Sequence, residues 1–131
     1  MINRTYPAVV ERVIDGDTYV LNIELGFGLT KNCRVRLLGV NTPEVRGSER
    51  IMGEASKAFV ESLIGGEKVL FNSSDKTDSF GRWLGTIEVD DCDLGELILE
   101  SQHGTVMAMS IDEGFIQRLR HWFRQLRFGS R

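Results

Sequence analysis

The sequence predicts an α+β domain built on a small five-stranded β-barrel with three helices. The first part of the chain contains three β-rich segments separated by tight-turn signals, which is typical of a β-meander. A helical segment and two further β-rich segments follow, and a segment with a clear helical period comes near the end. Five strands with a helix after the third are typical of a Greek-key barrel of the OB-fold type.

The predicted strands are marked by β-branched or aromatic residues and by turn signals at their ends. Asp15-Gly16 separates the first two strands, and Gly26-Phe27-Gly28 follows the second. We expect strands at 8–14, 18–23, 33–38, 68–71 and 84–89. The polar stretches 45–53 and 72–81 are expected to be loops.

Three helices are predicted from apolar periods and from end signals. The first covers 54–64 and ends at Gly65-Gly66, with an apolar stripe at Ala55, Ala58, Phe59 and Leu63. Asp93 with Glu96 three residues later is typical of a capping box, here for a short helix that ends near 101. The clearest period belongs to a last helix over 115–126, whose apolar residues are Phe115, Ile116, Leu119, Trp122, Phe123 and Leu126.

Length and composition predict one soluble globular domain covering residues 1–131. The chain is 41% hydrophobic and 27% charged, as expected for a soluble domain with its own core. No apolar run approaches a membrane span and the N-terminus lacks the apolar core of a signal peptide, so we expect a cytoplasmic protein with no membrane partner. Cys33 and Cys92 are far apart in the sequence and are expected to be free thiols.

The charge of the chain is unevenly distributed. A formal net charge of −3 argues against a strong general binder of nucleic acid. However, residues 83–113 contain eight acids and no lysine or arginine, whereas residues 114–131 contain five arginines and no acid. A segregated distribution can present a basic face while the total stays negative. The arginines of the last predicted helix are therefore either a solvated face or a contact to nucleic acid.

The stretch 36–44 combines the residue types that phosphodiester chemistry needs. Arg34 and Arg36 alternate with apolar residues, so both arginines lie on one face of the predicted strand. The strand ends at Gly39, and Thr42-Pro43 then brings Glu44 to the same region. Arginine binds phosphate through its planar fork, and a carboxylate can accept a proton or hold a metal. On this stretch alone, a buried strand followed by a turn with stray charges is an equally good interpretation.

Four motifs together resemble the staphylococcal nuclease (thermonuclease) family. They are Val-Ile-Asp-Gly-Asp-Thr at 13–18, Arg-Leu-Leu-Gly-Val-Asn-Thr-Pro-Glu at 36–44, Gly-Glu-Ala at 53–55 and Asp-Ser-Phe-Gly-Arg at 78–82. They occur in the same order as in that family, and the similarity covers roughly residues 8–104. The resemblance implies a five-stranded barrel with three helices and a metal-dependent phosphodiesterase that acts on DNA, RNA or both.

The resemblance also implies a role for individual residues. Residues that match metal-binding positions, for Ca²⁺ or alternatively Mg²⁺ or another divalent cation, are Asp17, Asn41 and the backbone carbonyl of Thr42. Glu44 matches the proposed general base, and two arginines match those that bind the scissile phosphate, Arg36 and Arg82. Further contacts to the nucleic acid are expected from Arg34, Arg46 and Lys76. No obligate protein partner is evident.

Several positions depart from the family pattern. Asn41 stands where the family has a second metal-binding aspartate, so the site has one negative charge less. Ser79 and Phe80 stand where the family has lysine and tyrosine, and the two tyrosines that frame the base in secreted members align near Ala108 and Ser110. Substrate preference therefore does not transfer from the family to this chain.

The departures leave a second function open. A non-catalytic member of the same fold would bind nucleic acid or a protein partner without cleaving it. The number of retained site residues favours the enzyme, because Asp17, Arg36, Glu44 and Arg82 are all present. An unrelated barrel that binds single strands would need aromatic platforms, and Tyr19 and Phe27 are too few for this.

Overall fold

A computed structural model describes residues 4–106 of the chain. Its five long strands are β1 (Arg4–Asp15), β2 (Thr18–Gly26), β3 (Leu29–Leu37), β5 (Lys68–Thr77) and β6 (Trp83–Val89). The helices are α1 (Arg50–Ile64) and α2 (Leu94–Glu100), preceded by the 3-10 turn η1 (Gly47–Glu49). Three two-residue strands complete the description, namely β4 (Val40–Asn41), β7 (Cys92–Asp93) and β8 (Thr105–Val106). The helix predicted over 115–126 lies outside the described residues.

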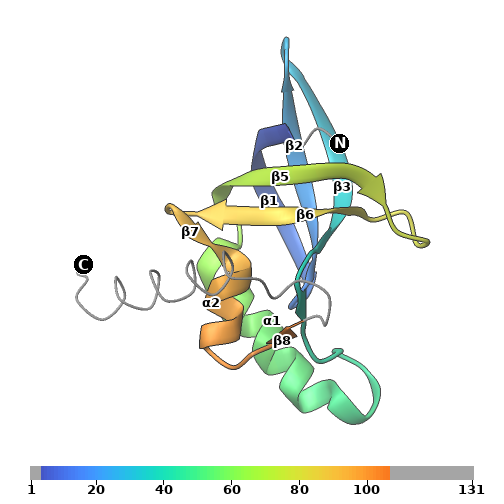
Figure 1. Cartoon of the computed structure of the whole chain (residues 1–131), viewed down its shortest axis with the longest axis vertical. Coiled ribbons are helices and arrows are strands. Elements are labelled where there is room, and N and C mark those ends of the chain that lie inside the picture. The colour runs from blue at the N-terminus through green and yellow to red at the C-terminus, as the bar shows by residue number, and fades with distance from the viewer. Residues whose placement is uncertain (1–3, 107–131) are drawn as a thin grey trace.

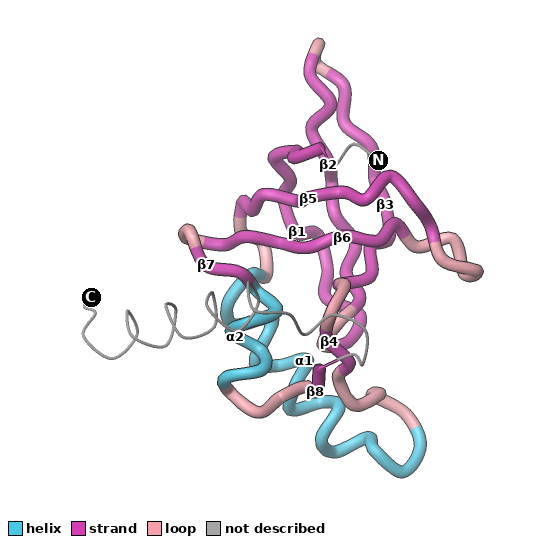
Figure 2. The backbone as a smooth tube through the Cα atoms, in the orientation of Figure 1, coloured by secondary structure: helices cyan, strands magenta, loops and turns pink. Residues whose placement is uncertain are grey.

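The strands close into a barrel, as predicted. The order β3-β2-β1-β5-β6 is antiparallel throughout, and a parallel pairing of β6 with β3 joins the two edges. Figures 1 and 2 show β5 and β6 crossing β1, β2 and β3, with α1 and α2 gathered at one end of the barrel. The predicted α+β class and OB-fold type are confirmed, with two α-helices in the described part of the chain.

Alternating side chains of the strands fill the barrel. Ala8 and Val10 are buried on β1, and a register shift between Val10 and Arg12 lets Val13 also point inward. Tyr19 and Leu21 continue the buried face on β2. The helices cover one end of this core through residues that are essentially fully buried, namely Val60, Ile64, Leu94 and Ile98.

The predicted apolar stripe of the first helix is wrong in part. Ala55 and Ala58 are exposed, whereas Phe59 and Leu63 are partly buried against the core. The buried face of α1 instead contains Gly53, Ser56, Val60 and Ile64. Gly53 is small because a Cβ there would overlap the backbone of Glu44, and the Ser56 hydroxyl donates to the carbonyl oxygen of His103 at 2.7 Å.

Two predicted loops are largely regular structure. Helix α1 begins at Arg50 rather than at 54, directly after η1, so 45–53 is only partly a loop. Strand β5 continues to Thr77, so the polar stretch 72–77 belongs to the sheet. Its polar side chains pair across the outer face, where the Asn72 amide donates to Thr86 and Glu88. Polarity here marks a solvated strand face and not the absence of a strand.

The predicted cap of the second helix is confirmed. The Asp93 carboxylate accepts a hydrogen bond from the backbone amide of Glu96 at 3.0 Å and so caps α2. Cys33 is buried and Cys92 half-buried, and neither is in a disulfide with another described residue. Among the described residues, no helix has the length and apolar character needed to cross a membrane.

Candidate active site

The ends of three strands meet beside the β1–β2 turn. Strand β3 pairs with β2 on one side, where Thr18 lies opposite Arg36, and with β6 on the other, where Arg36 lies opposite Leu84. Arg36 is therefore flanked by the turn that carries Asp17 and by the start of β6 after Arg82. The barrel topology alone brings these three residues together from distant parts of the chain.

Arg36 is held in place by the chain around it. Its Nη1 donates to the carbonyl oxygens of Leu37 at 2.5 Å and Val40 at 2.9 Å. Its Nη2 lies 2.6 Å from Oδ1 of Asn41 and 3.4 Å from Oδ2 of Asp17. The side chains of Arg36 and Asp17 are 14% and 10% exposed, so this ion pair is mostly removed from water. The guanidinium orientation is thus fixed before any ligand arrives.

Asp17 is a buried carboxylate at the centre of the cluster. Its Oδ2 accepts the backbone amide of Thr42 at 3.0 Å, and its Oδ1 accepts the Thr18 hydroxyl at 3.2 Å. Oδ1 of Asp15 accepts the Asp17 backbone amide at 3.2 Å. Burial, together with the hydrogen bond and negative charge of the Asp17 carboxylate, raises the pKa of Asp15 to about 6. The turn therefore holds two neighbouring carboxylates whose charges repel each other.

From the sequence alone, Asp15 is interpreted as a turn residue. An Asp-Gly-Asp turn is a common hairpin signal, and nothing in its composition shows that both carboxylates will be withdrawn from water. Thr42 packs against Gly16 of this turn, and that contact is not visible in the local sequence. A cation bound here would reduce the repulsion between Asp15 and Asp17.

Arg82 joins the same network from the β5–β6 connection. Its Nη1 donates to the Thr18 hydroxyl at 3.0 Å, and that hydroxyl donates to Asp17. Its Nε donates to Oδ2 of Asp78 at 2.8 Å. Its guanidinium carbon lies 5.4 Å from the ring centre of Phe80, which is 81% exposed. Thr18 therefore links Arg82 to Asp17, and through Asp17 to Arg36.

Asp78 organises the connection that presents Arg82. Its Oδ1 accepts the backbone amides of Phe80 at 2.9 Å and Arg82 at 3.0 Å. Burial acts to raise the pKa of Asp78, but these two amides and the Arg82 guanidinium outweigh it and hold the pKa below its usual value. The sequence motif at 78–82 had pointed to Arg82, while the positioning role of Asp78 is visible only in the structure.

The oxygen donors of Asn41 and Thr42 lie in this network as well. Strand β8 pairs with β4 and fixes Asn41 opposite Thr105. The Thr42 hydroxyl oxygen is buried and has no hydrogen-bond partner among the described residues, and a Cβ on Gly16 would lie 2.7 Å from it. A buried hydroxyl without a described partner, two neighbouring carboxylates and an amide oxygen are ligands that suit a hard divalent cation.

The oxygen ligands available to a cation nevertheless carry little negative charge. No group of three or more histidine, cysteine, aspartate or glutamate side chains suitable for a metal occurs between residues 4 and 106. Oδ1 of Asn41 also accepts a hydrogen bond from Arg36. The residues therefore fit a weak cation site that depends on Asp17, with neutral oxygens from Asn41 and Thr42.

Glu44 stands apart from the cluster. Its backbone amide donates to Oε1 of Glu49 at 3.3 Å, and a Cβ on Gly53 of α1 would overlap its carbonyl oxygen. The backbone of Glu44 is therefore fixed against the start of α1. Its carboxylate is exposed and makes no hydrogen bond or ion pair with another described residue.

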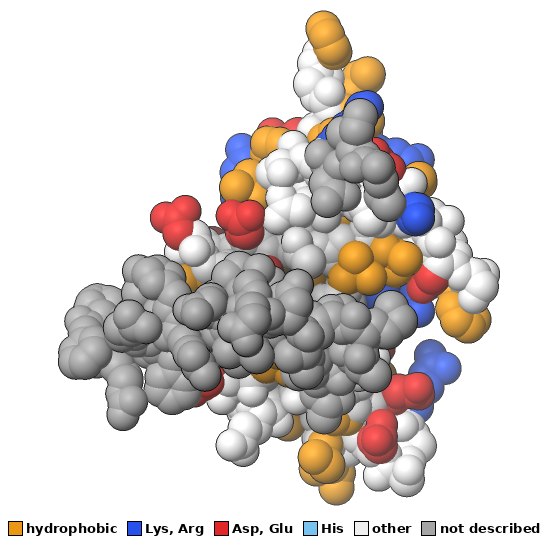
Figure 3. All heavy atoms as spheres, in the orientation of Figure 1, with side chains coloured by type: hydrophobic (Ala, Val, Ile, Leu, Met, Phe, Trp, Pro, Cys, Tyr) orange, Lys and Arg blue, Asp and Glu red, His pale blue; other side chains and the backbone are white. Residues whose placement is uncertain are grey.

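The three residues expected to contact nucleic acid are all exposed. Arg34 lies two residues before Arg36 on β3, Arg46 directly precedes η1, and Lys76 lies near the end of β5. None of their side chains bonds to a described residue of the cluster. On the face drawn in Figure 3, basic and acidic side chains are mixed on the side of β3 and of the β5–β6 connection. The structure thus gathers Asp17, Arg36, Asn41, Thr42 and Arg82, and leaves Arg34, Arg46 and Lys76 dispersed.

Comparison with known families supports the resemblance seen in the motifs. A family model described as staphylococcal nuclease homologue matches residues 34–120, which is more than half of the chain. A comparison with curated proteins gave no match. The matched range contains Arg36, Asn41, Thr42, Glu44 and Arg82, whereas Asp17 precedes it.

Proposed function

The chain belongs to the family of staphylococcal nuclease homologues, and we therefore propose that it is a divalent-cation-dependent nuclease that hydrolyses phosphodiester bonds of DNA, RNA or both. Family membership supports a nuclease-like or nucleic-acid-binding module. One observation favours hydrolysis: the continuous network from Arg36 through Asp17 and Thr18 to Arg82. Such a pair of guanidinium groups, fixed in orientation, suits a tetrahedral phosphate. We also propose that residues 1–131 form one domain.

In this proposal Arg36 and Arg82 bind the scissile phosphate. Among the described residues, Nη2 of Arg82 has no partner, whereas both Nη groups of Arg36 contact the chain and only its Nε has none. These contacts prevent reorientation of both guanidinium groups during the reaction. Negative charge grows on the non-bridging oxygens as water attacks phosphorus, and fixed cations stabilise that charge without reorganising. Lysine would keep the charge but lose the planar fork.

Glu44 is proposed as the general base. Its exposed carboxylate accepts a proton as a water molecule forms a bond to phosphorus and the opposite phosphorus–oxygen bond breaks. Contact with Gly53 fixes the backbone that carries it. Asp17, Asn41 and the Thr42 carbonyl would hold the cation, Ca²⁺ or alternatively Mg²⁺. When bound, such an ion polarises the phosphate and offsets its charge.

Nucleic acid would extend beyond the cluster along basic side chains. Arg34 continues the face of β3 that carries Arg36, Arg46 lies on the connection before η1, and Lys76 lies near the end of β5. We propose that these three residues contact the flanking backbone phosphates. Phosphate contacts fix register and orientation but do not select sequence.

The direct test is incubation of the purified protein with single- and double-stranded DNA and RNA in the presence of Ca²⁺, Mg²⁺ or a chelator. We expect cleavage with at least one cation and none with the chelator. Binding without cleavage under every condition would favour the non-catalytic alternative.

The Asn41→Asp variant is expected to lower the cation concentration that gives half-maximal cleavage. It adds a negative charge with nearly the same shape, and cation affinity rises with the charge of the ligand set. A Ca²⁺ titration of the cleavage rate and of direct binding measures this, with Gln102→Glu as a matched amide-to-carboxylate change at an exposed site after α2. Unchanged curves for Asn41→Asp would show that Asn41 is not a ligand.

A further inference from the structure

Three residues of the candidate site lie on one short segment, residues 40–44. They are Asn41, Thr42 and Glu44. Only the first two residues of this segment form a strand, β4, and the other three belong to no helix or strand. A segment with so little regular structure of its own takes its geometry from the elements that pack against it.

Helix α1 packs against the far end of this segment. A Cβ added to Gly53 would overlap the carbonyl group of Glu44, so the helix and the segment touch through their backbones. A larger residue at position 53 would push the two apart. The helix therefore sets the position of the segment where it carries the proposed base.

The same face of α1 also holds the loop that follows α2. Ser56 lies three residues after Gly53 on the buried face of the helix and is 1% exposed. Its hydroxyl donates to the carbonyl oxygen of His103 at 2.7 Å. The imidazole of His103 stacks on the ring of Phe59, with the ring centres 4.6 Å apart. One buried hydrogen bond and one ring contact thus attach the loop to α1.

The loop that Ser56 holds lies directly against β4. A Cβ on Gly104 would lie 2.9 Å from the carbonyl oxygen of Asn41, so the loop and the strand are in close contact. Immediately after this glycine, β8 pairs with β4 and places Thr105 opposite Asn41. The carbonyl group that accepts the Ser56 hydroxyl is therefore only one residue away from the glycine that touches β4.

Strand β4 in turn orients groups of the candidate site. Nη1 of Arg36 donates to the carbonyl oxygen of Val40 at 2.9 Å, and its Nη2 lies 2.6 Å from Oδ1 of Asn41. The backbone amide of Thr42, directly after β4, donates to Oδ2 of Asp17 at 3.0 Å. A displacement of β4 would therefore move the proposed phosphate-binding arginine and the proposed cation ligands together.

We propose that Ser56 is a positioning residue of the active site, which holds β4, and with it Asn41 and Thr42, in place for the cation through its bond to His103. The proposal rests on the proposed function, because that function assigns the cation to these groups. Ser56 is not itself a ligand. Groups that orient the ligands of a metal change its affinity by roughly 10–100-fold when they are removed.

The test removes the hydroxyl with Ser56→Ala. The probe is the cation that supports cleavage, Ca²⁺ or Mg²⁺, titrated by calorimetry at a temperature where circular dichroism shows the variant to be fully folded. We expect the dissociation constant of the cation to rise about tenfold, because β4 loses part of its support. The cation concentration that gives half-maximal cleavage should rise by a similar factor.

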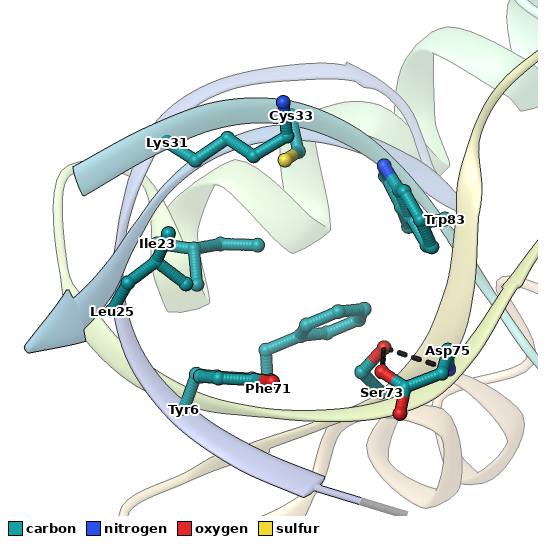
Figure 4. A pocket seen from close by; sticks show the side chains of 9 residues that line it. All are labelled: Tyr6, Ile23, Leu25, Lys31, Cys33, Phe71, Ser73, Asp75 and Trp83. Atoms are coloured by element: carbon teal, nitrogen blue, oxygen red, sulfur yellow. Dashed lines mark hydrogen bonds between the residues drawn. The ribbon is translucent and has the colours of Figure 1, made fainter. Parts of the chain in front are cut away.

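The matched control is Ser73→Ala, which removes the hydroxyl of another buried serine. Ser73 is 5% exposed, and its hydroxyl exchanges hydrogen bonds with Asp75. It lines a pocket of about 120 Å³ at the end of the barrel away from the helices (Figure 4). Because this serine has no hydrogen bond to residues 40–44 or to the loop that holds them, Ser73→Ala should leave both cation measurements unchanged.

Two further variants distinguish positioning from a purely structural role. Gly104→Ala places a methyl group against the carbonyl oxygen of Asn41 and should also weaken cation binding. In a double-mutant cycle, Ser56→Ala should have a smaller effect on cation binding when Asn41→Ala has already removed a side chain that β4 carries. A serine that only stabilises the fold would change the unfolding midpoint and leave the cation affinity of the folded protein as it was.

Equal cation affinities for Ser56→Ala and the wild type would overturn the positioning role while leaving the nuclease proposal intact. Absence of cleavage by the wild-type protein with both Ca²⁺ and Mg²⁺ would overturn both proposals.

Discussion

Cleavage is expected to fall by about 10²–10⁴-fold when Glu44 is replaced by glutamine. The substitution keeps the size and polarity of the side chain and removes its ability to accept the proton of the attacking water. Glu44 is exposed and its carboxylate bonds to no other described residue, so the free energy of unfolding should change by less than about 0.5 kcal/mol. The measurement is the single-turnover cleavage rate at saturating cation.

The matched control for this prediction is Glu54→Gln. Glu54 is an exposed glutamate on α1 whose partner is Arg50 at 3.4 Å, so the control removes the same charge close to Glu44 without touching the proposed base. We expect wild-type cleavage from Glu54→Gln. Comparable rates for the two variants would remove Glu44 from the mechanism.

Arg36→Met is expected to lower the free energy of unfolding by about 3–5 kcal/mol, because it leaves the buried Asp17 carboxylate without its cation. This is a large part of the roughly 5–15 kcal/mol that stabilises a typical domain. The variant also frees the carbonyl oxygens of Leu37 and Val40 from their Arg36 donor. Urea unfolding followed by circular dichroism measures the change.

Two further variants distinguish the cost of losing the ion pair from the other costs of removing an arginine. Arg34→Met removes an exposed arginine from the same strand and should cost less than about 0.5 kcal/mol. In a double-mutant cycle, Arg36→Met should cost less when Asp17→Asn has already removed the buried charge. Additive costs would mean that the two groups do not stabilise each other.

The sequence predicted the strands of the barrel well, but it predicted the ends of those strands less well. Hairpin turns and apolar alternation are local signals, so strands such as β2 were predicted close to their observed positions. Strand β5 was predicted to end at 71 because its later residues are polar, yet Asn72 pairs with Thr86 and Glu88 on a solvated face. That pairing depends on β6, which no local pattern reveals.

The candidate site was likewise predicted only in part. The motifs predicted that Asp17, Arg36 and Arg82 would lie together, and the structure places all three in one hydrogen-bonded network. The raised pKa of Asp15 depends mainly on burial, which comes from the tertiary structure around the turn and not from the Asp-Gly-Asp sequence itself.

The single-turnover cleavage rate of Arg82→Lys, compared with that of Arg34→Lys, tests the central claim most directly. Both variants keep the positive charge and remove the planar fork, but only Arg82 belongs to the network with Asp17 and Arg36. If the network is a phosphodiesterase site, Arg82→Lys should lose about 10²-fold or more of the rate, while Arg34→Lys stays within a few-fold of wild type. Equal rates for the two variants would contradict the assignment of this cluster as the site of cleavage.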